Sequence, residues 1–167
     1  MGYTVGTNVR ITTQEQRSFL KRLAAKVPFD FFVTSGSRDA YEQAAAMLKK
    51  VELGGREELT TLYADKVYAN AVADAYPDIE MAALIVQRKF DESPSAHSRG
   101  LAVDIRTRTL SAEQIEELQK AVQQLGATSL LELVPPHLHV EIPEKKRLPF
   151  LLPVLLLGGL ALTVKSK

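Results

Sequence analysis

All three histidines of the chain fall in two short segments that also contain carboxylates. In the first segment His97 precedes Asp104, with Gly100 between them. In the second, His137 and His139 alternate with apolar residues, which in an extended strand places both imidazoles on one face. A catalytic zinc ion takes three protein ligands with nitrogen or oxygen donors and keeps a fourth position for water. The two segments therefore predict one zinc site.

From the residues alone, the predicted ligand set is His97, Asp104 and either His137 or His139. The histidine left over would lie beside the metal, where an imidazole with a pKa near about 6.5 can exchange a proton with water or a leaving amine. Glu141 shares the predicted strand face of the two histidines. Any one of these side chains by itself would more often be an ordinary half-buried residue. The combination carries the prediction.

The composition limits the remaining possibilities. The chain has 167 residues, 46% of them hydrophobic and 25% charged, which indicates one globular domain with a short appendage and excludes a disordered or multi-span protein. Because there is no cysteine, disulfides, cysteine-bound metals and thiol nucleophiles are excluded. The formal net charge of +1 argues against nucleic acid as a partner.

These residues must be positioned by helices and strands, and the sequence predicts both, in an α+β domain. Cap signals at Thr13, Asp39 and Ser111, and a Gly54-Gly55 break, predict helices over residues 14–26, 40–53, 56–76 and 112–125. Apolar or alternating runs predict strands over 31–34, 101–105, 128–133 and 137–142.

The segment Ser95–Asp104 reads Ser-x-His-x-x-Gly-x-Ala-x-Asp. This pattern resembles the zinc-site motif of the D-Ala-D-Ala carboxypeptidase and L-alanyl-D-glutamate endopeptidase family, which has the hedgehog/DD-peptidase fold. The later His-x-His resembles the closing segment of related murein endopeptidases, and residues 34–38 resemble the family's strand-end Ser-Gly-x-Arg. The likeness covers residues 32–142 and implies a small antiparallel sheet with helices packed on it.

The resemblance also implies roles for single residues. His97, Asp104 and His139 become the zinc ligands, and His137 becomes the proton-transfer residue. Arg38 would hold a substrate carboxylate or a transition-state oxygen, because a guanidinium fork suits a carboxylate. Ser95 would either bind within the site or only form the turn before His97. The implied activity is hydrolysis of a bond to a D-residue in the peptidoglycan stem peptide, by a carboxypeptidase or an endopeptidase.

The chain departs from the family at the catalytic base. Many members carry an acidic residue two or three positions before the last ligand, where this chain has Pro136 and His137. We therefore consider His137, Glu132 and Glu141 as candidates for the base, and Glu141 also as a group that orients a ligand imidazole. The missing acid favours an alternative function, a zinc-binding module for cell wall or protein that does not turn over substrate.

Residues 148–164 form an uncharged stretch of 17 residues between the basic residues of 144–147 and those of 165–167. As a helix rising about 1.5 Å per residue, this stretch is near the lower limit for crossing a bilayer. We expect residues 1–143 to form the peptidase domain, 144–147 a juxtamembrane linker and 148–164 a transmembrane or membrane-inserted helix in contact with lipid. Residues 1–12 lack the pattern of a secretory signal. An anchored wall-lytic component of a virus or phage, in a host or internal virion membrane, would combine these features.

Overall fold

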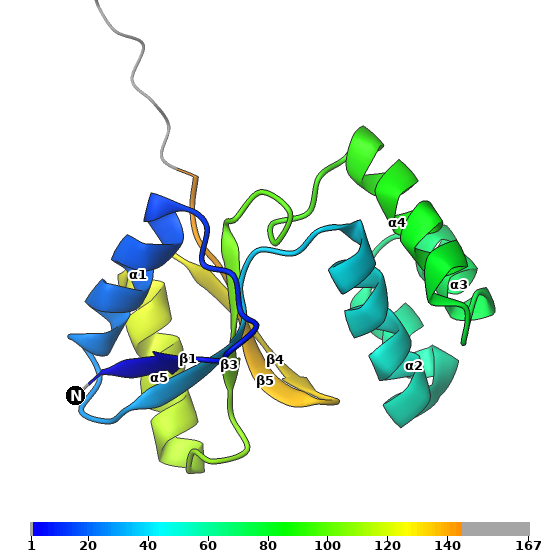
Figure 1. Cartoon of the computed structure of the whole chain (residues 1–167). Helices are drawn as coiled ribbons and strands as arrows, with labels where there is room; N and C mark the ends of the chain where they lie inside the picture. The colour runs from blue at the N-terminus through cyan, green and yellow to red at the C-terminus, as the bar shows by residue number, and fades with distance from the viewer. Residues whose placement is uncertain (1, 145–167) are drawn as a thin grey trace, which may run out of the picture.

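The computed structural model describes residues 2–144. Residues 145–147 of the predicted linker, the predicted membrane segment 148–164 and the basic residues of 165–167 lie outside the described residues. Ten elements follow one another along the chain (Figure 1). The strands are β1 (Tyr3–Val5), β2 (Phe31–Ser35), β3 (Ala102–Arg106), β4 (Thr128–Leu133) and β5 (Pro136–Glu141). The helices are α1 (Gln14–Ala24), α2 (Ala40–Leu62), α3 (Lys66–Asp74), α4 (Ile79–Glu92) and α5 (Ala112–Gln124). The predicted α+β class is confirmed.

The five strands form one sheet in the order β1-β2-β3-β5-β4. The pairs β2–β3, β3–β5 and β5–β4 are antiparallel, but β1 runs parallel to β2. The sheet is therefore mixed, and the prediction of an antiparallel sheet was wrong at this edge. The sequence did not reveal β1 because three residues are too few for a period-two pattern. Tyr3 holds the strand in place by stacking on Phe31, with ring centroids 5.8 Å apart.

One face of the sheet packs on α1 and α5, and we call these two helices with the five strands the sheet region (Figure 1). Its core joins alternate strand residues to the inward stripe of each helix, as the two periodicities require. The largest fully buried side chains of this core are Phe19, Leu20, Leu23, Ile105, Leu118 and Leu138. Since these residues occupy one face, the histidines and carboxylates of the same strands are left on the other.

Helices α2, α3 and α4 lie across from the second face and form the helical region (Figure 1). They have a separate apolar core that includes Met47, Leu59, Val72 and Val86. The predicted break at Gly54-Gly55 appears as a kink in α2, where Gly55 has a φ of 77°. The predicted helix 56–76 was wrong as a single element, because Asp65 accepts from the Tyr68 amide and starts a new helix, α3.

The predicted helix starts are confirmed. Thr13, Asp39 and Ser111 each form a capping box, with Gln16, Glu42 and Gln114 as the reciprocal partners. Within residues 2–144, no helix combines the length and the apolar composition needed to cross a bilayer.

Candidate metal centre

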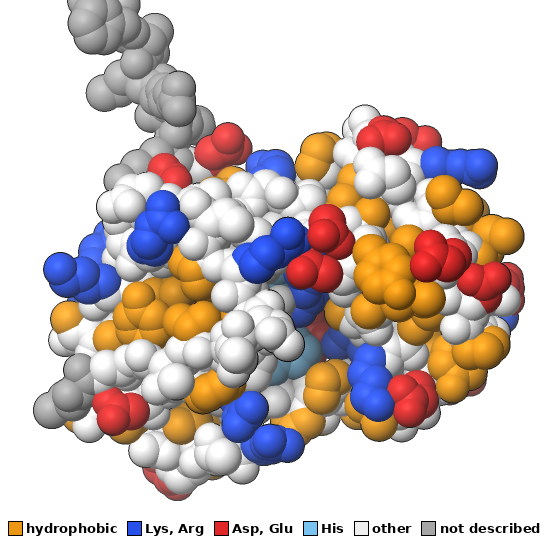
Figure 2. Space-filling model, in the orientation of Figure 1, with side chains coloured by type: hydrophobic (Ala, Val, Ile, Leu, Met, Phe, Trp, Pro, Cys, Tyr) orange, Lys and Arg blue, Asp and Glu red, His pale blue; other side chains and the backbone are white. Residues whose placement is uncertain are grey.

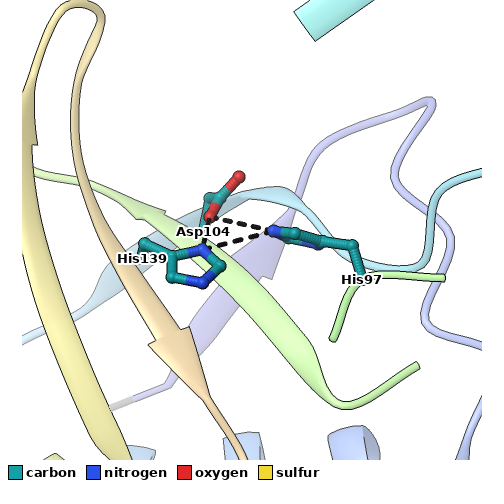
Figure 3. A group of neighbouring side chains, drawn as sticks. All are labelled: His97, Asp104 and His139. Atoms are coloured by element: carbon teal, nitrogen blue, oxygen red, sulfur yellow. Dashed lines mark hydrogen bonds and ion pairs between the residues drawn. The ribbon is translucent and has the colours of Figure 1, made fainter. Parts of the chain in front are cut away.

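Three segments bring His97, Asp104 and His139 together on the open face of the sheet (Figure 3). His97 lies in the turn before β3, Asp104 lies on β3, and His139 is its direct partner on β5. One ligand atom from each residue lies within 4.8 Å of the other two. Among the described residues this is the group whose side chains could hold a metal ion. The prediction that these residues converge is confirmed.

The His97 ring is held by the backbone of a second motif. Its Nδ1 is 2.5 Å from the carbonyl oxygen of Gly36, to which only a protonated nitrogen can donate. The other nitrogen, Nε2, therefore faces Asp104 at 3.3 Å with its lone pair free for a metal. Glycine is required at 36 because a Cβ there would overlap the Arg10 carbonyl. The Ser-Gly-x-Arg segment thus orients the first ligand.

A glycine is also required behind His97. Gly100 has a φ of 66°, and a Cβ on it would collide with the Thr13 side chain. Thr13 donates from its hydroxyl to the Gly100 carbonyl at 2.7 Å, which ties the turn to the start of α1. The glycine of the Ser-x-His-x-x-Gly motif therefore permits the turn that delivers His97 to the sheet.

Asp104 lies at the centre of the site and is 2% exposed. Its Oδ1 is 2.9 Å from His139 Nδ1 and 3.3 Å from His97 Nε2, while its Oδ2 is paired with the Arg38 guanidinium. Burial alone would raise the pKa of Asp104, but the hydrogen bond of His139, the neighbouring His97 ring and the charge of Arg38 outweigh burial and hold that pKa well below its usual range. The carboxylate is therefore ionised, as a metal ligand must be.

His139 turns Nδ1 toward Asp104 and Nε2 toward Glu141 Oε1, which is 3.5 Å away. Burial lowers the pKa of His139, but the hydrogen bond and charge of Asp104 exceed that effect and raise it overall. Glu141 is 56% exposed in its side chain and sits behind the ring. Of the two roles predicted for Glu141, this position fits the one of orienting a ligand imidazole.

His137 lies beside the three ligands but outside their group. Its Nδ1 donates to the Pro135 carbonyl at 2.6 Å, so the neutral ring carries no proton on Nε2. That Nε2 is 3.7 Å from Asp104 Oδ1 and 3.4 Å from Glu132 Oε2. An unprotonated imidazole nitrogen is a hydrogen-bond acceptor and can accept a proton.

Glu132 on β4 forms an ion pair with Lys50, a residue that was not predicted as part of the site. Lys50 of α2 donates to Glu132 Oε2 and, at 3.2 Å, to the Val134 carbonyl. The Lys50 and Glu132 side chains are only 9% and 11% exposed. The pair thus links the helical region to the strand hairpin that carries His137.

Arg38 and Ser95 both reach the site, in different ways. Besides Asp104, the Arg38 guanidinium donates to Ser35 Oγ at 2.7 Å and to Gln43 Oε1 at 3.3 Å. The sequence did not predict that Arg38 would bind a metal ligand. Ser95 Oγ accepts from the Ser98 amide at 3.1 Å, which supports the turn before His97. Both side chains also line the cavity described next.

The site opens into a cavity of about 530 Å³ between the sheet and α2. Figure 2 shows a histidine at the bottom of this hollow, with basic side chains around it. From α2 and its end the cavity is lined by Gln43, Lys50 and Tyr63. Gln43 also donates to the Tyr63 hydroxyl at 2.9 Å, and burial raises the pKa of Tyr63 to about 12.

Three residues of the site were not predicted from the sequence: Gln43, Lys50 and Tyr63. One signal was present in the sequence. Gln43 and Lys50 are seven residues apart on a helix whose other buried residues include Ala44, Met47 and Leu48. Buried polar residues that share a helix face usually have partners on another element.

The donor set fits a metal ion on chemical grounds. It offers two imidazole nitrogens and one ionised carboxylate, and the outward atoms of all three ligands already have partners: Gly36 for His97, Arg38 for Asp104 and Glu141 for His139. Such outer partners fix the orientation of metal ligands. The buried His97–Asp104–His139 group could therefore hold a metal ion.

Comparisons of the chain with protein-family models, with curated proteins and with solved structures found no match.

Proposed function

We propose that this chain is a zinc-dependent peptidase that hydrolyses a peptide bond involving a D-amino acid in the peptidoglycan stem peptide. The motif resemblance supplies the substrate. One observation carries the metal chemistry: ligand atoms of His97, Asp104 and His139, from separate parts of the chain, lie within 4.8 Å of one another. Two imidazoles and a carboxylate are a donor set typical of catalytic zinc.

A zinc ion held by these residues would supply a Lewis acid that activates water and polarises a carbonyl. The chain itself supplies the proton acceptor. His137 Nε2 is unprotonated in the neutral ring and lies 3.7 Å from Asp104 Oδ1, within reach of a water molecule at the site. Glu132, 3.4 Å from the same nitrogen, would stabilise the imidazolium after proton transfer. His137 would then return the proton to the leaving amine.

Arg38 would act on the same step through Asp104. Its charge keeps the carboxylate ionised, and its position in the cavity also allows contact with a substrate oxygen. Glu141 would hold the His139 ring so that Nδ1 remains directed at the metal. In this proposal Glu132 assists the base and does not replace it, because Lys50 already occupies its Oε2.

The test is to incubate the purified full chain with cell-wall sacculi and to identify the released peptides by mass spectrometry. We expect release that stops on addition of a chelator and returns with zinc. The His137→Gln variant should keep its zinc and lose about 100-fold or more in rate, the scale of general acid–base catalysis. Glu116→Gln, an exposed change on α5, is the matched control. Release that survives chelation, or no release by the zinc-loaded chain, would contradict the proposal.

A second function is favoured by two observations: Pro136 and His137 stand where the family has its acidic base, and the nearby Glu132 is already paired with Lys50. In this alternative the chain is a zinc-binding module that holds cell wall or a protein partner in the cavity without hydrolysis. The same experiment separates the two. Zinc-dependent retention of wall material with no product, equal in wild type and His137→Gln, would support the module.

We further propose that residues 148–164 anchor the domain in a host membrane or an internal virion membrane, as in a wall-lytic component used in entry or lysis. The support is the sequence of 17 uncharged residues between basic flanks. Membrane flotation of the full chain tests this proposal. Recovery in the lipid fraction is expected, and recovery entirely in the soluble fraction would contradict anchoring.

A further inference from the structure

The cavity over the metal centre carries more positive than negative side chains. Its basic lining residues are Arg38, Lys49, Lys50, Arg106 and Arg108. Its acidic lining residues are Asp104, Glu132 and Glu141. A divalent ion bound to the ligands would add further positive charge. A cavity with this balance attracts anionic ligands.

Most of these charges already have a partner. Arg38 is paired with Asp104, Lys50 with Glu132 and Lys49 with Glu52 of its own helix. By contrast, neither Arg106 nor Arg108 has a carboxylate oxygen within 4.0 Å among residues 2–144. Two arginines in one cavity are thus available for a ligand.

Arg106 is the better placed of the two. It is half-buried at the end of β3, and its side chain lies on the same strand face as that of Asp104, two residues earlier. Its direct partner across the sheet is His137. Two residues of strand span about 7 Å, so Arg106 lies roughly two residues of an extended peptide away from the metal ligands.

The orientation of Arg106 is also fixed before any ligand binds. Its guanidinium carbon lies 4.3 Å from the centroid of the Phe32 ring, over the face of the aromatic side chain. A stacked guanidinium keeps its N–H groups in its own plane, directed away from the ring, where they suit the two oxygens of a carboxylate. Such preorganisation lowers the entropy cost of binding.

We propose that Arg106, stacked on Phe32 and opposite His137 in the sheet, binds a side-chain carboxylate of the substrate one or two residues from the scissile bond, with Arg108 beside it. This subsite makes the chain selective for acidic peptides. The inference rests on the proposed function only in taking the ligand to be a peptide. Arg106 is then a specificity-determining residue distinct from Arg38, which is engaged with Asp104.

The test measures binding and hydrolysis separately. The probes are short peptides ending in D-alanine that carry one glutamate at successive positions, each matched by a peptide with glutamine at the same position. Affinities for the zinc-loaded full chain are measured by calorimetry at about 0.15 M salt, where the field of distant charges is screened. At one position we expect the glutamate peptide to bind about tenfold or more tightly, as one charge-assisted hydrogen bond allows.

Arg106→Gln should abolish the preference for the glutamate peptide. Arg106→Lys should retain part of this preference, because the positive charge remains but the bidentate guanidinium is lost. Lys49→Gln removes a cavity charge that is paired within α2, and it should leave the preference unchanged. Equal affinity of the wild type for both peptides at every position, no binding of either, or an undiminished preference in Arg106→Gln would overturn the subsite. A preference that depends on Arg106 in a chain that cleaves none of the peptides would support the subsite and count against the peptidase.

Discussion

The sheet region and the helical region contribute differently to the candidate site. The sheet region supplies two of the three candidate ligands, Asp104 and His139, as direct cross-strand partners, and the third, His97, lies in the turn that leads into β3. From the helical side, Gln43 binds Arg38, Lys50 binds Glu132, and Tyr63 at the end of α2 lines the cavity. Strand register fixes side chains to a ladder of backbone hydrogen bonds, whereas packed helices can shift. We therefore expect changes in the sheet to affect metal binding more than changes in the helical region do.

The largest effect on stability is expected at the ion pair that joins the two regions. Lys50→Ala leaves the buried Glu132 carboxylate without its partner, and breaking such a pair costs about 3–5 kcal/mol. Lys50→Met combined with Glu132→Leu should cost much less, because no charge remains buried. Chemical denaturation measures both variants. Equal losses in the single and double variants would mean that the pair itself is not the link.

The second prediction compares the two cores. Leu138 of β5 and Leu59 of α2 are both fully buried, so replacing either by alanine should lower the free energy of unfolding by about 2–5 kcal/mol. Only Leu138→Ala should also weaken metal binding, since Leu138 lies between His137 and His139. Denaturation and zinc titration of the two variants provide the measurement. A loss of zinc affinity in Leu59→Ala would show that the helical region takes part in holding the metal.

The third prediction concerns Arg38, which touches both regions through Asp104 and Gln43. Arg38→Gln removes the charge that stabilises the carboxylate, and the loss of such an outer partner typically weakens metal binding about 10–100-fold. Competition with a zinc indicator measures this change. Gln43→Leu serves as the comparison from the helical region and should have the smaller effect. An unchanged zinc affinity in Arg38→Gln would mean that Arg38 does not support the metal site and could act only on the substrate.

The smallest expected change is a pH dependence of stability, which would be measured in acid. In the metal-free chain the pKa of Asp104 is held well below the unfolded value of about 3.9, so its ionised form stabilises the fold. That stabilisation is fully present above the unfolded pKa and is lost as the pH falls through the folded pKa. The difference in unfolding free energy between wild type and Asp104→Asn should therefore shrink below about pH 4. A difference independent of pH would contradict the assignment.

The sequence predicted the sheet region and its site better than the helical region. His97, Asp104 and one of His137 and His139 were predicted as ligands because strand alternation and residue spacing are local signals, and the family resemblance then implied His139. The extent of α3 and the parallel pairing of β1 were not predicted, because both depend on contacts between distant segments. Lys50 shows the same effect. Its position on a helix can be predicted from the sequence, but its pairing with Glu132 cannot, because Glu132 lies 82 residues later in the chain.

The most direct test of the metal centre is metal analysis of the purified full chain and of its His97→Ala variant. We expect one tightly bound zinc ion per wild-type chain and none in the variant, with unchanged circular dichroism because His97 lies in a turn outside both cores. A folded His97→Ala chain that keeps its full equivalent of zinc, or a wild-type chain that binds none, would contradict the metal centre on which the proposed function depends.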